Sequence, residues 1–176
     1  MPADLQRYLL QPGVLDIPRM QEDGLYPSDE RIRKGPIAVL ECSQEIPCNP
    51  CETACKKGFI EIGSDITALP RLDPECSGCG LCLPRCPGLS IFIVDGSLPG
   101  DLASVTIPYE FLPLPEVDEV VDALDRWGER VCDARIISIK RQYPRDLCYS
   151  IKMEIPFSQV HTVRHFRKKR TTGEGK

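Results

Sequence analysis

The 176-residue sequence has few aromatic side chains and no long apolar run. Phe, Trp and Tyr make up 6% of the chain, and 17 prolines interrupt it. This composition favours short elements and a thin apolar core, so another source of stability is expected. No apolar stretch approaches the roughly 20 residues of a membrane-spanning helix, and the first residues lack the pattern of a secretory signal. We therefore expect a soluble, cytoplasmic protein without a membrane span.

The sequence also lacks the common motifs of catalysis. It contains no Gly-rich phosphate loop and no dinucleotide fingerprint, and neither a nucleophile–base pair nor a carboxylate dyad is visible. We expect no catalytic residue in this chain and no NAD or FAD bound by the chain alone. His161 and His165 are four residues apart but lack the Glu of the zinc-protease motif. They are therefore interpreted as an exposed helix end.

Cysteine, by contrast, is abundant, with ten residues in the chain. Without an export signal, this density indicates metal binding more than disulfides. The run Cys76-Ser-Gly-Cys79-Gly-Leu-Cys82-Leu-Pro-Arg-Cys86-Pro87 has the C-x2-C-x2-C-x3-C-P spacing of bacterial-type 4Fe–4S proteins. Three of these thiolates can hold three corners of one cluster, while the fourth ligates another cluster. A structural zinc ribbon is the main alternative, but zinc takes four ligands and gives no reason for a proline-closed run of four cysteines.

An earlier run, Cys42-x5-Cys48-x2-Cys51-x3-Cys55, departs from this pattern. Five residues separate its first two cysteines, and Lys56 takes the place of the expected proline. The two runs together nevertheless resemble the two-cluster ferredoxin family. This resemblance implies a first 4Fe–4S cluster on Cys42, Cys48, Cys51 and Cys86, and a second 4Fe–4S cluster on Cys76, Cys79, Cys82 and Cys55.

Cys42 is the ligand that the residues leave open. If it does not bind, the first site would hold a three-iron cluster or use a non-cysteine ligand. We favour Cys42 as a ligand because it directly follows a predicted strand at 37–40. Cys132 and Cys148 lie outside both runs and are interpreted as buried free thiols.

The predicted fold class is α+β, in four segments. Residues 1–34 are expected to form an extended docking arm with a helical turn around Leu5–Leu10. Residues 35–98 are expected to form a ferredoxin-like domain in which two halves, each of strand, ligand loop, short helix and strand, are related by a pseudo-twofold axis. Its strands are predicted at 37–40, 59–62 and 91–94, whereas the strand that opens the second half is poorly marked.

The remaining two segments are predicted to be a small domain and a tail. Residues 99–157 should form one helix on an antiparallel sheet, because Val117, Val120, Val121, Leu124 and Trp127 share one helical face. Strands follow at 132–136 and 149–155, joined as a hairpin near Pro144. Residues 158–176 should form a short helix and a solvated basic tail that includes Arg164, Arg167, Lys168, Lys169 and Arg170.

Three segments resemble one particular family more closely than they resemble ferredoxins in general. They are Lys34 to Glu52, Cys76 to Asp95, and Ile107 to Pro115 followed by Ala123 to Arg126. They are similar to the small iron–sulfur subunits of bacterial FAD-dependent dehydrogenases that act on amino acids or secondary amines, of the proline, hydroxyproline or opine type. The resemblance implies a non-catalytic electron-transfer subunit in a hetero-oligomer, with FAD only in the partner subunit and a further 2Fe–2S subunit as a candidate neighbour.

Two other functions are open. A free-standing ferredoxin would carry the same clusters, although a long arm and a second domain give such a carrier no obvious advantage. A structural zinc or nucleic-acid-binding module would use the basic tail, but the acidic remainder of the chain disfavours nucleic acid.

Overall fold

The structure is a computed structural model that describes residues 9–11, 14–42 and 45–169. Within these ranges the helices are α1 (Ile17–Glu22), α2 (Asp29–Arg33) and α3 (Pro50–Ala54), with 3₁₀ turns η2 (Leu83–Arg85) and η3 (Phe157–Gln159). The strands are β1 (Leu9–Gln11), β2 (Val14–Leu15), β3 (Ile37–Leu40), β4 (Ile60–Glu61), β5 (Arg71–Leu72), β6 (Ile91–Asp95), β7 (Leu102–Tyr109), β8 (Val120–Leu124), β9 (Arg130–Lys140), β10 (Tyr149–Pro156) and β11 (His165–Lys168).

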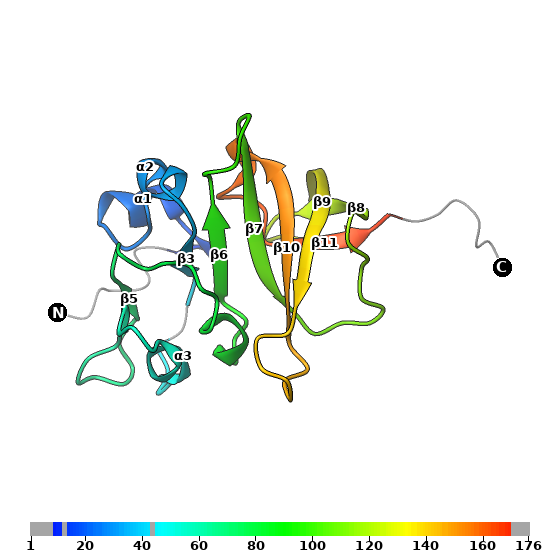
Figure 1. The fold of residues 1–176 in the computed structure, drawn as a ribbon. Helices are drawn as coiled ribbons and strands as arrows, with labels where there is room; N and C mark the ends of the chain where they lie inside the picture. The colour runs from blue at the N-terminus through cyan, green and yellow to red at the C-terminus, as the bar shows by residue number, and fades with distance from the viewer. Residues whose placement is uncertain (1–8, 12–13, 43–44, 170–176) are drawn as a thin grey trace.

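A seven-stranded sheet in the order β11-β8-β9-β10-β7-β6-β3 organises the chain (Figure 1). All of its neighbouring strands are antiparallel. The predicted α+β class is therefore confirmed, with a mostly antiparallel sheet and few, short helices. No helix in the described ranges has the length and apolar character that crossing a membrane requires.

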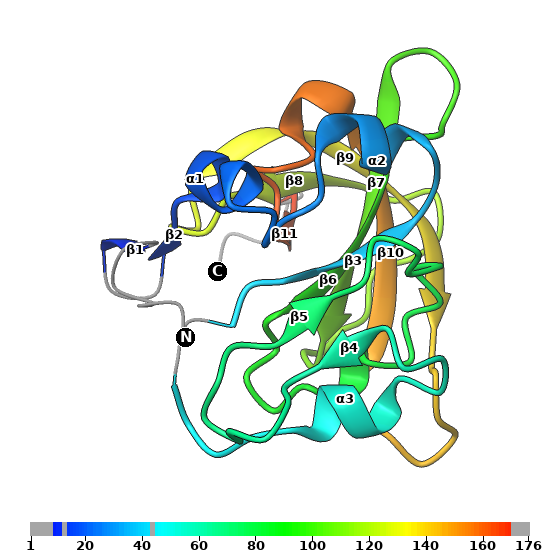
Figure 2. The same ribbon diagram turned by 90° about the vertical axis from the view of Figure 1, so that its left-hand side faces the viewer.

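The part of the chain between β3 and β6 contains the eight clustered cysteines and leaves the large sheet (Figure 2). The strands predicted at 37–40, 59–62 and 91–94 correspond to β3, β4 and β6. The two outer strands, β3 and β6, pair with each other, and so do the inner strands β4 and β5. The poorly marked strand of the second half is β5, which has only two residues.

The N-terminal segment differs from the predicted extended arm. Residues 14–34 pack on the rest of the chain through α1 and α2, and they bury Ile17, Met20, Tyr26 and Ile32 in the common core. Both helices have N-caps, since Asp16 accepts a hydrogen bond from the Arg19 N–H and Ser28 accepts one from the Arg31 N–H. The turn predicted around Leu5–Leu10 lies largely outside the described residues, and Leu9 belongs to β1.

The helix predicted over 117–127 is wrong. Residues 120–124 form β8, in which Val121 and Ala123 are buried between β9 and β11. Asp125 and Gly128 instead form the turn into β9, because the Asp125 carboxylate accepts hydrogen bonds from the N–H groups of Trp127 and Glu129. Valine-rich segments pack well in strands, and pairing on both sides of β8 outweighs the helical spacing.

The C-terminal segment also differs from its prediction. Residues 165–168 form β11 rather than a helix, and Arg164 is buried rather than solvated. The predicted hairpin near Pro144 is confirmed, because β9 and β10 pair directly. Strand β7 was not predicted, and it places β6 and β10 in one sheet. The boundary predicted at residue 98 therefore falls between two paired strands, β6 and β7.

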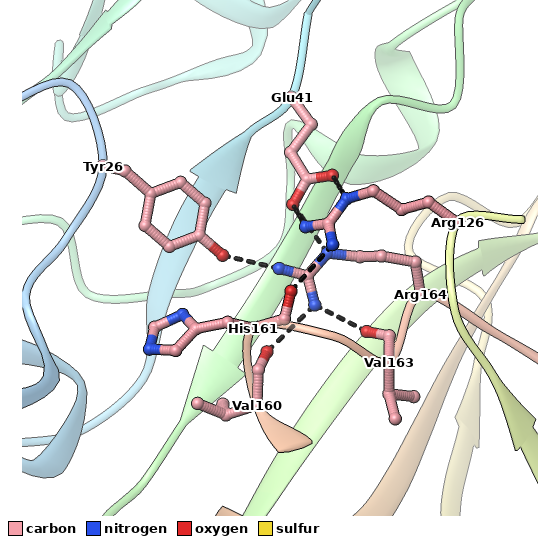
Figure 3. A network of polar contacts seen from close by, with 7 residues as sticks. All are labelled: Tyr26, Glu41, Arg126, Val160, His161, Val163 and Arg164. Carbon is pink, nitrogen blue, oxygen red and sulfur yellow. Dashed lines mark hydrogen bonds and ion pairs between the residues drawn. The ribbon is translucent and has the colours of Figure 1, made fainter. Parts of the chain in front are cut away.

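A buried ionic network joins four parts of the chain that are distant in sequence (Figure 3). The Glu41 carboxylate accepts hydrogen bonds from Arg126 at 2.6 and 2.8 Å and from Arg164 at 2.6 Å. Arg164 also donates to the Tyr26 hydroxyl at 2.5 Å and to the carbonyls of Val160 and Val163. Burial alone would raise the pKa of Glu41, but the two guanidinium groups outweigh it and lower that pKa. The network therefore holds the end of β3, the β8–β9 turn and the start of β11 together.

Replacing Glu41 should destabilise the protein strongly. The substitution Glu41→Gln leaves two guanidinium groups buried without their counter-charge, at a cost of about 3 kcal/mol in the free energy of unfolding. Urea unfolding monitored by circular dichroism measures this cost. Glu30→Gln is the control, because the Glu30–Lys34 pair is exposed and should contribute almost nothing. A Glu41 variant as stable as this control would contradict the role of the network.

The stability that Glu41 supplies should also depend on pH. The pKa of this carboxyl is lower in the folded chain than its ordinary value of 4.5, so its contribution is complete above that value and is lost as pH falls through the folded pKa. The difference in unfolding free energy between wild type and Glu41→Gln should therefore shrink in acid. Unfolding curves at a series of pH values from neutral downward test this, and a constant difference would contradict it.

Candidate functional site

Two cavities gather the clustered cysteines into two groups. One cavity, of about 30 Å³, is lined by the thiols of Cys42, Cys48, Cys51 and Cys86. The other cavity, of about 220 Å³, is lined by the thiols of Cys55, Cys76, Cys79 and Cys82. We call them the small and the large cysteine cavity. Each takes three cysteines from one run and the last cysteine of the other run, which is the grouping that the family resemblance implies.

Two short helical turns produce this exchange. Helix α3 contains Cys51 and ends at Cys55, and η2 lies between Cys82 and Cys86. The last cysteine of each run, Cys55 or Cys86, is the C-cap residue of its turn, where the backbone leaves the helical conformation, and it lines the other cavity. Helix α3 packs against η2, which places the two cavities next to each other.

The large sheet supplies one wall of both cavities. Side chains alternate between the two faces of a strand. Ala38 and Ile93, which pair across β3 and β6, line the large cysteine cavity, and the next such pair, Leu40 and Ile91, lines the small one. The residue after Leu40 is Glu41, the carboxylate of the ionic network. Cys42, which comes next, lines the small cavity. The network thus holds the backbone at the residue before the first cysteine.

Backbone N–H groups point at three of the cysteine sulfurs. Phe59 donates to Cys55 Sγ at 3.2 Å, Gly78 to Cys76 Sγ at 3.5 Å, and Ser90 to Cys86 Sγ at 3.4 Å. Hydrogen bonds of this kind stabilise negative charge on sulfur and tune metal-bound thiolates.

Burial, and to a smaller extent the proximity of the sulfurs, opposes ionisation of two of the cysteines. Burial, to which the neighbouring Cys76, Cys79 and Cys55 add, raises the pKa of Cys82 to about 12. Burial also raises the pKa of Cys51 to about 11, where Cys86 and Cys48 add to the rise although the Glu52 N–H opposes it. Four thiolates in one cavity would repel one another, so their joint ionisation requires a cationic group among them.

The shape of the two cavities bears on which metal group they can hold. Across the described ranges, no three His, Cys, Asp or Glu side chains come close enough to hold a single metal ion. Zinc would require four ligands around one point, whereas an iron–sulfur cluster takes each thiolate at a different iron. The cysteines lie around the large cavity, and this cavity fits such a cluster. The small cavity, at about 30 Å³, has room for two or three waters, since each needs about 10–15 Å³, and is too small for a cluster as it stands.

One edge of the large cysteine cavity reaches the surface. Cys79 is exposed, whereas the other cysteines of the two groups are buried or half-buried. Lys56 and Lys57 line the same cavity, and Lys57 lies within hydrogen-bond distance of the Ser77 hydroxyl. The small cavity has an apolar lining instead, which includes Ile46.

Sequence analysis did not identify the side chains that hold the cysteine loops in place. Arg31 of α2 donates to three backbone carbonyls, those of Pro74 and Cys76 at 2.6 Å and that of Gly35 at 3.1 Å. From the β9–β10 connection, Tyr143 donates to the Leu81 carbonyl and stacks under the Arg85 guanidinium. These contacts join segments distant in sequence, so no local pattern could have predicted them.

The two cysteines outside the runs lie away from both cavities. Cys132 is in β9 and half-buried, and Cys148 is buried just before β10. Both are free thiols. Comparison of the chain with models of protein families, with curated proteins and with solved structures gives no match. The resemblance to iron–sulfur subunits therefore stays a prediction, and the function is argued from the two cavities.

Gly78 should be indispensable to the large cavity. Its φ is +59°, and a Cβ there would lie 2.6 Å from backbone and side-chain carbons of Pro36 and 2.8 Å from the Ile37 nitrogen. Gly100 is the matched control, because its φ is +73° but a Cβ there would contact nothing. Both alanine substitutions strain the backbone, so Gly78→Ala should cost about 1–3 kcal/mol more than Gly100→Ala from the collision alone. Equal unfolding free energies in urea would show that the loop has room to shift.

Proposed function

We propose that the protein is an electron-transfer subunit with two 4Fe–4S clusters. Cys42, Cys48, Cys51 and Cys86 would hold the first, and Cys76, Cys79, Cys82 and Cys55 the second. The observation that carries this proposal is the exchange of the last cysteine of each run between the two cavities. A bacterial-type cluster run requires that its fourth cysteine ligate the other cluster.

The strand pairing around the cavities supports a ferredoxin-like domain. The order strand, ligand loop, helical turn and strand occurs twice, in β3-α3-β4 and in β5-η2-β6. Pairing of the outer strands and of the inner strands is what a pseudo-twofold axis between the two halves requires. Each half has little apolar surface of its own, so the halves depend on each other and on the large sheet.

The chain's own residues would prepare the sites for electron transfer. A bound 4Fe–4S cluster supplies single-electron redox chemistry. The N–H groups of Phe59, Gly78 and Ser90 would stabilise the thiolates, and the apolar wall of β3 and β6 would exclude water. The exposed position of Cys79 gives the second site an edge at which a redox partner can approach.

The proposed partner is an FAD-dependent dehydrogenase of an amino acid or a secondary amine. In this complex the partner would bind FAD and oxidise the substrate, and this chain would relay electrons to or from it without catalysing a reaction itself. A further 2Fe–2S subunit would complete a hetero-oligomer. The sequence segments that resemble such subunits support the partner and its substrate class, and they include both cysteine runs.

A free-standing ferredoxin is the second candidate function. The packing of residues 14–34 on the chain's own core favours it, because a packed segment is not a free docking arm. Co-expression with a neighbouring flavoprotein subunit separates the two functions: a stable complex after size-exclusion chromatography supports the subunit, and a monomer that reduces several acceptors supports the carrier.

Metal analysis should show about eight iron and eight sulfide ions per chain on anaerobically purified protein. After reduction, electron paramagnetic resonance should show two interacting clusters. Cys55→Ser and Cys86→Ser should each remove about half of the iron, whereas Cys132→Ser should leave the iron content unchanged. Zinc in place of iron, or iron lost from the Cys132 variant, would contradict the ligand assignment.

Double variants test the exchange between the two runs. Because Cys55 and Cys76 are assigned to one cluster, the double variant Cys55→Ser/Cys76→Ser should contain as much iron as either single variant. Cys55→Ser/Cys51→Ser should lose both clusters, although these two cysteines lie on the same helical turn. The opposite result would assign each run of four to its own cluster and would refute the proposal.

A further inference from the structure

Cationic side chains surround the exposed edge of the large cysteine cavity at Cys79. Lys56 and Lys57 directly follow Cys55, line this cavity and are exposed. Lys57 reaches the loop that contains Cys79, because its ammonium lies 3.4 Å from the Ser77 hydroxyl. None of the described residues that line the cavity is acidic.

A second pair of lysines approaches Cys79 from the sheet. Another cavity, of about 180 Å³, shares Cys79 and its two neighbouring glycines with the large one and extends over β7, β9 and β10. Lys140 of β9 and Lys152 of β10 line it together with Asp95, which lies 3.6 Å from the Lys152 ammonium. Lys140 is exposed.

Most of this positive charge is not compensated within the described part of the chain. The lysines that form ion pairs there are Lys34, Lys152, Lys168 and Lys169. Lys56, Lys57 and Lys140 are not among them. The four lysines and Asp95 give the surroundings of Cys79 a charge of +3, in a chain whose formal net charge is −4. The rest of the chain therefore carries −7.

This charge distribution determines which partner surface fits. A positive site on an acidic body attracts an acidic surface at that site and repels it elsewhere, so the two proteins meet in one orientation. Encounters between redox proteins bury little area, typically below about 1,200 Å², and charge therefore has a large share in orienting them. A basic partner would be attracted to the acidic remainder of the chain, away from the exposed cysteine.

We propose that the redox partner docks at the Cys79 edge with an acidic surface, which Lys56, Lys57 and Lys140 recognise. Electrons would be exchanged there, between the partner and the second cluster. The small cysteine cavity offers no such rim, because no described residue that lines it is charged. This inference rests on the proposed electron-transfer function and adds to it the point of exchange and the charge of the partner's surface.

Stopped-flow oxidation of the reduced, iron-loaded protein tests the charge at the point of exchange. Each oxidant takes one electron from a reduced cluster: the ferricyanide anion becomes ferrocyanide, and the tris(phenanthroline)cobalt(III) cation becomes the cobalt(II) complex. Between about 10 and about 200 mM salt, the rate constant should fall with ferricyanide and rise with the cobalt complex, because salt screens attraction in one case and repulsion in the other. The net charge of the whole chain would give the opposite signs.

Matched variants assign the effect to the lysines. Lys56→Gln/Lys57→Gln should lower the ferricyanide rate constant at low salt about threefold or more, and Lys140→Gln should lower it in the same direction. The control Lys34→Gln/Lys169→Gln changes the net charge as much as the first variant, at residues that line neither cavity, and should leave the rate constant nearly unchanged.

Carbodiimide coupling gives a second readout, which does not depend on electron transfer. The protein is mixed at low salt with a hexaglutamate peptide and a water-soluble carbodiimide, which takes up the water lost as a carboxylate and an amine form an amide. Mass spectrometry should find the peptide on Lys56, Lys57 or Lys140 in preference to Lys34 and Lys169.

The outcomes separate this inference from the proposal on which it rests. Iron is measured on every sample, and wild type without iron would overturn the electron-transfer function and the docking site together. Iron-loaded protein that reacts faster with ferricyanide as salt rises would overturn the docking site alone. So would lysine variants that behave like the control, or peptide coupling spread evenly over the lysines.

Discussion

The pairing of Glu41 with Arg126 and Arg164 is the interaction on which the rest of the structure depends. It buries a carboxylate between two guanidinium groups, which is favourable only when every polar atom is satisfied. The Tyr26 hydroxyl and two backbone carbonyls accept the remaining hydrogen bonds of the Arg164 guanidinium. The network therefore forms only when the N-terminal segment, the end of β3 and the start of β11 are all in place. It makes the packing of residues 14–34 and of β11 a condition for the position of Cys42.

The cysteine region has the opposite character, because it contains little apolar surface and few regular elements. Its strands β4 and β5 have two residues each, and its loops are held by single side chains such as Arg31 and Tyr143. A segment of this kind gains order from the sheet on which it lies and, if the proposed clusters bind, from the metal as well. The large sheet and the proposed clusters would together be the source of stability, besides the core, that is expected of a chain with few aromatic residues.

Prediction from sequence succeeded where the signal was local. Residues 37–40 and 91–94 are apolar runs, and 149–155 alternate, so all were recognised as strands. The resemblance to two-cluster ferredoxins implied the same two groups of cysteines that line the two cavities. It failed at 117–127, where the same valines satisfy a helical period and a strand, and the partners β9 and β11 decide. The burial of Arg164 and the clamp by Arg31 could not be predicted, because both depend on residues more than 40 positions away.

The two cysteine cavities differ in the charged residues that line them, and this difference affects which of the two proposed clusters would hold an electron. Of the residues that the structure describes, no charged one lines the small cavity, whereas Lys56 and Lys57 line the large one. Reduction adds negative charge, so nearby ammonium groups favour it. In the proposed relay, an electron would therefore settle at the second cluster, nearest the surface.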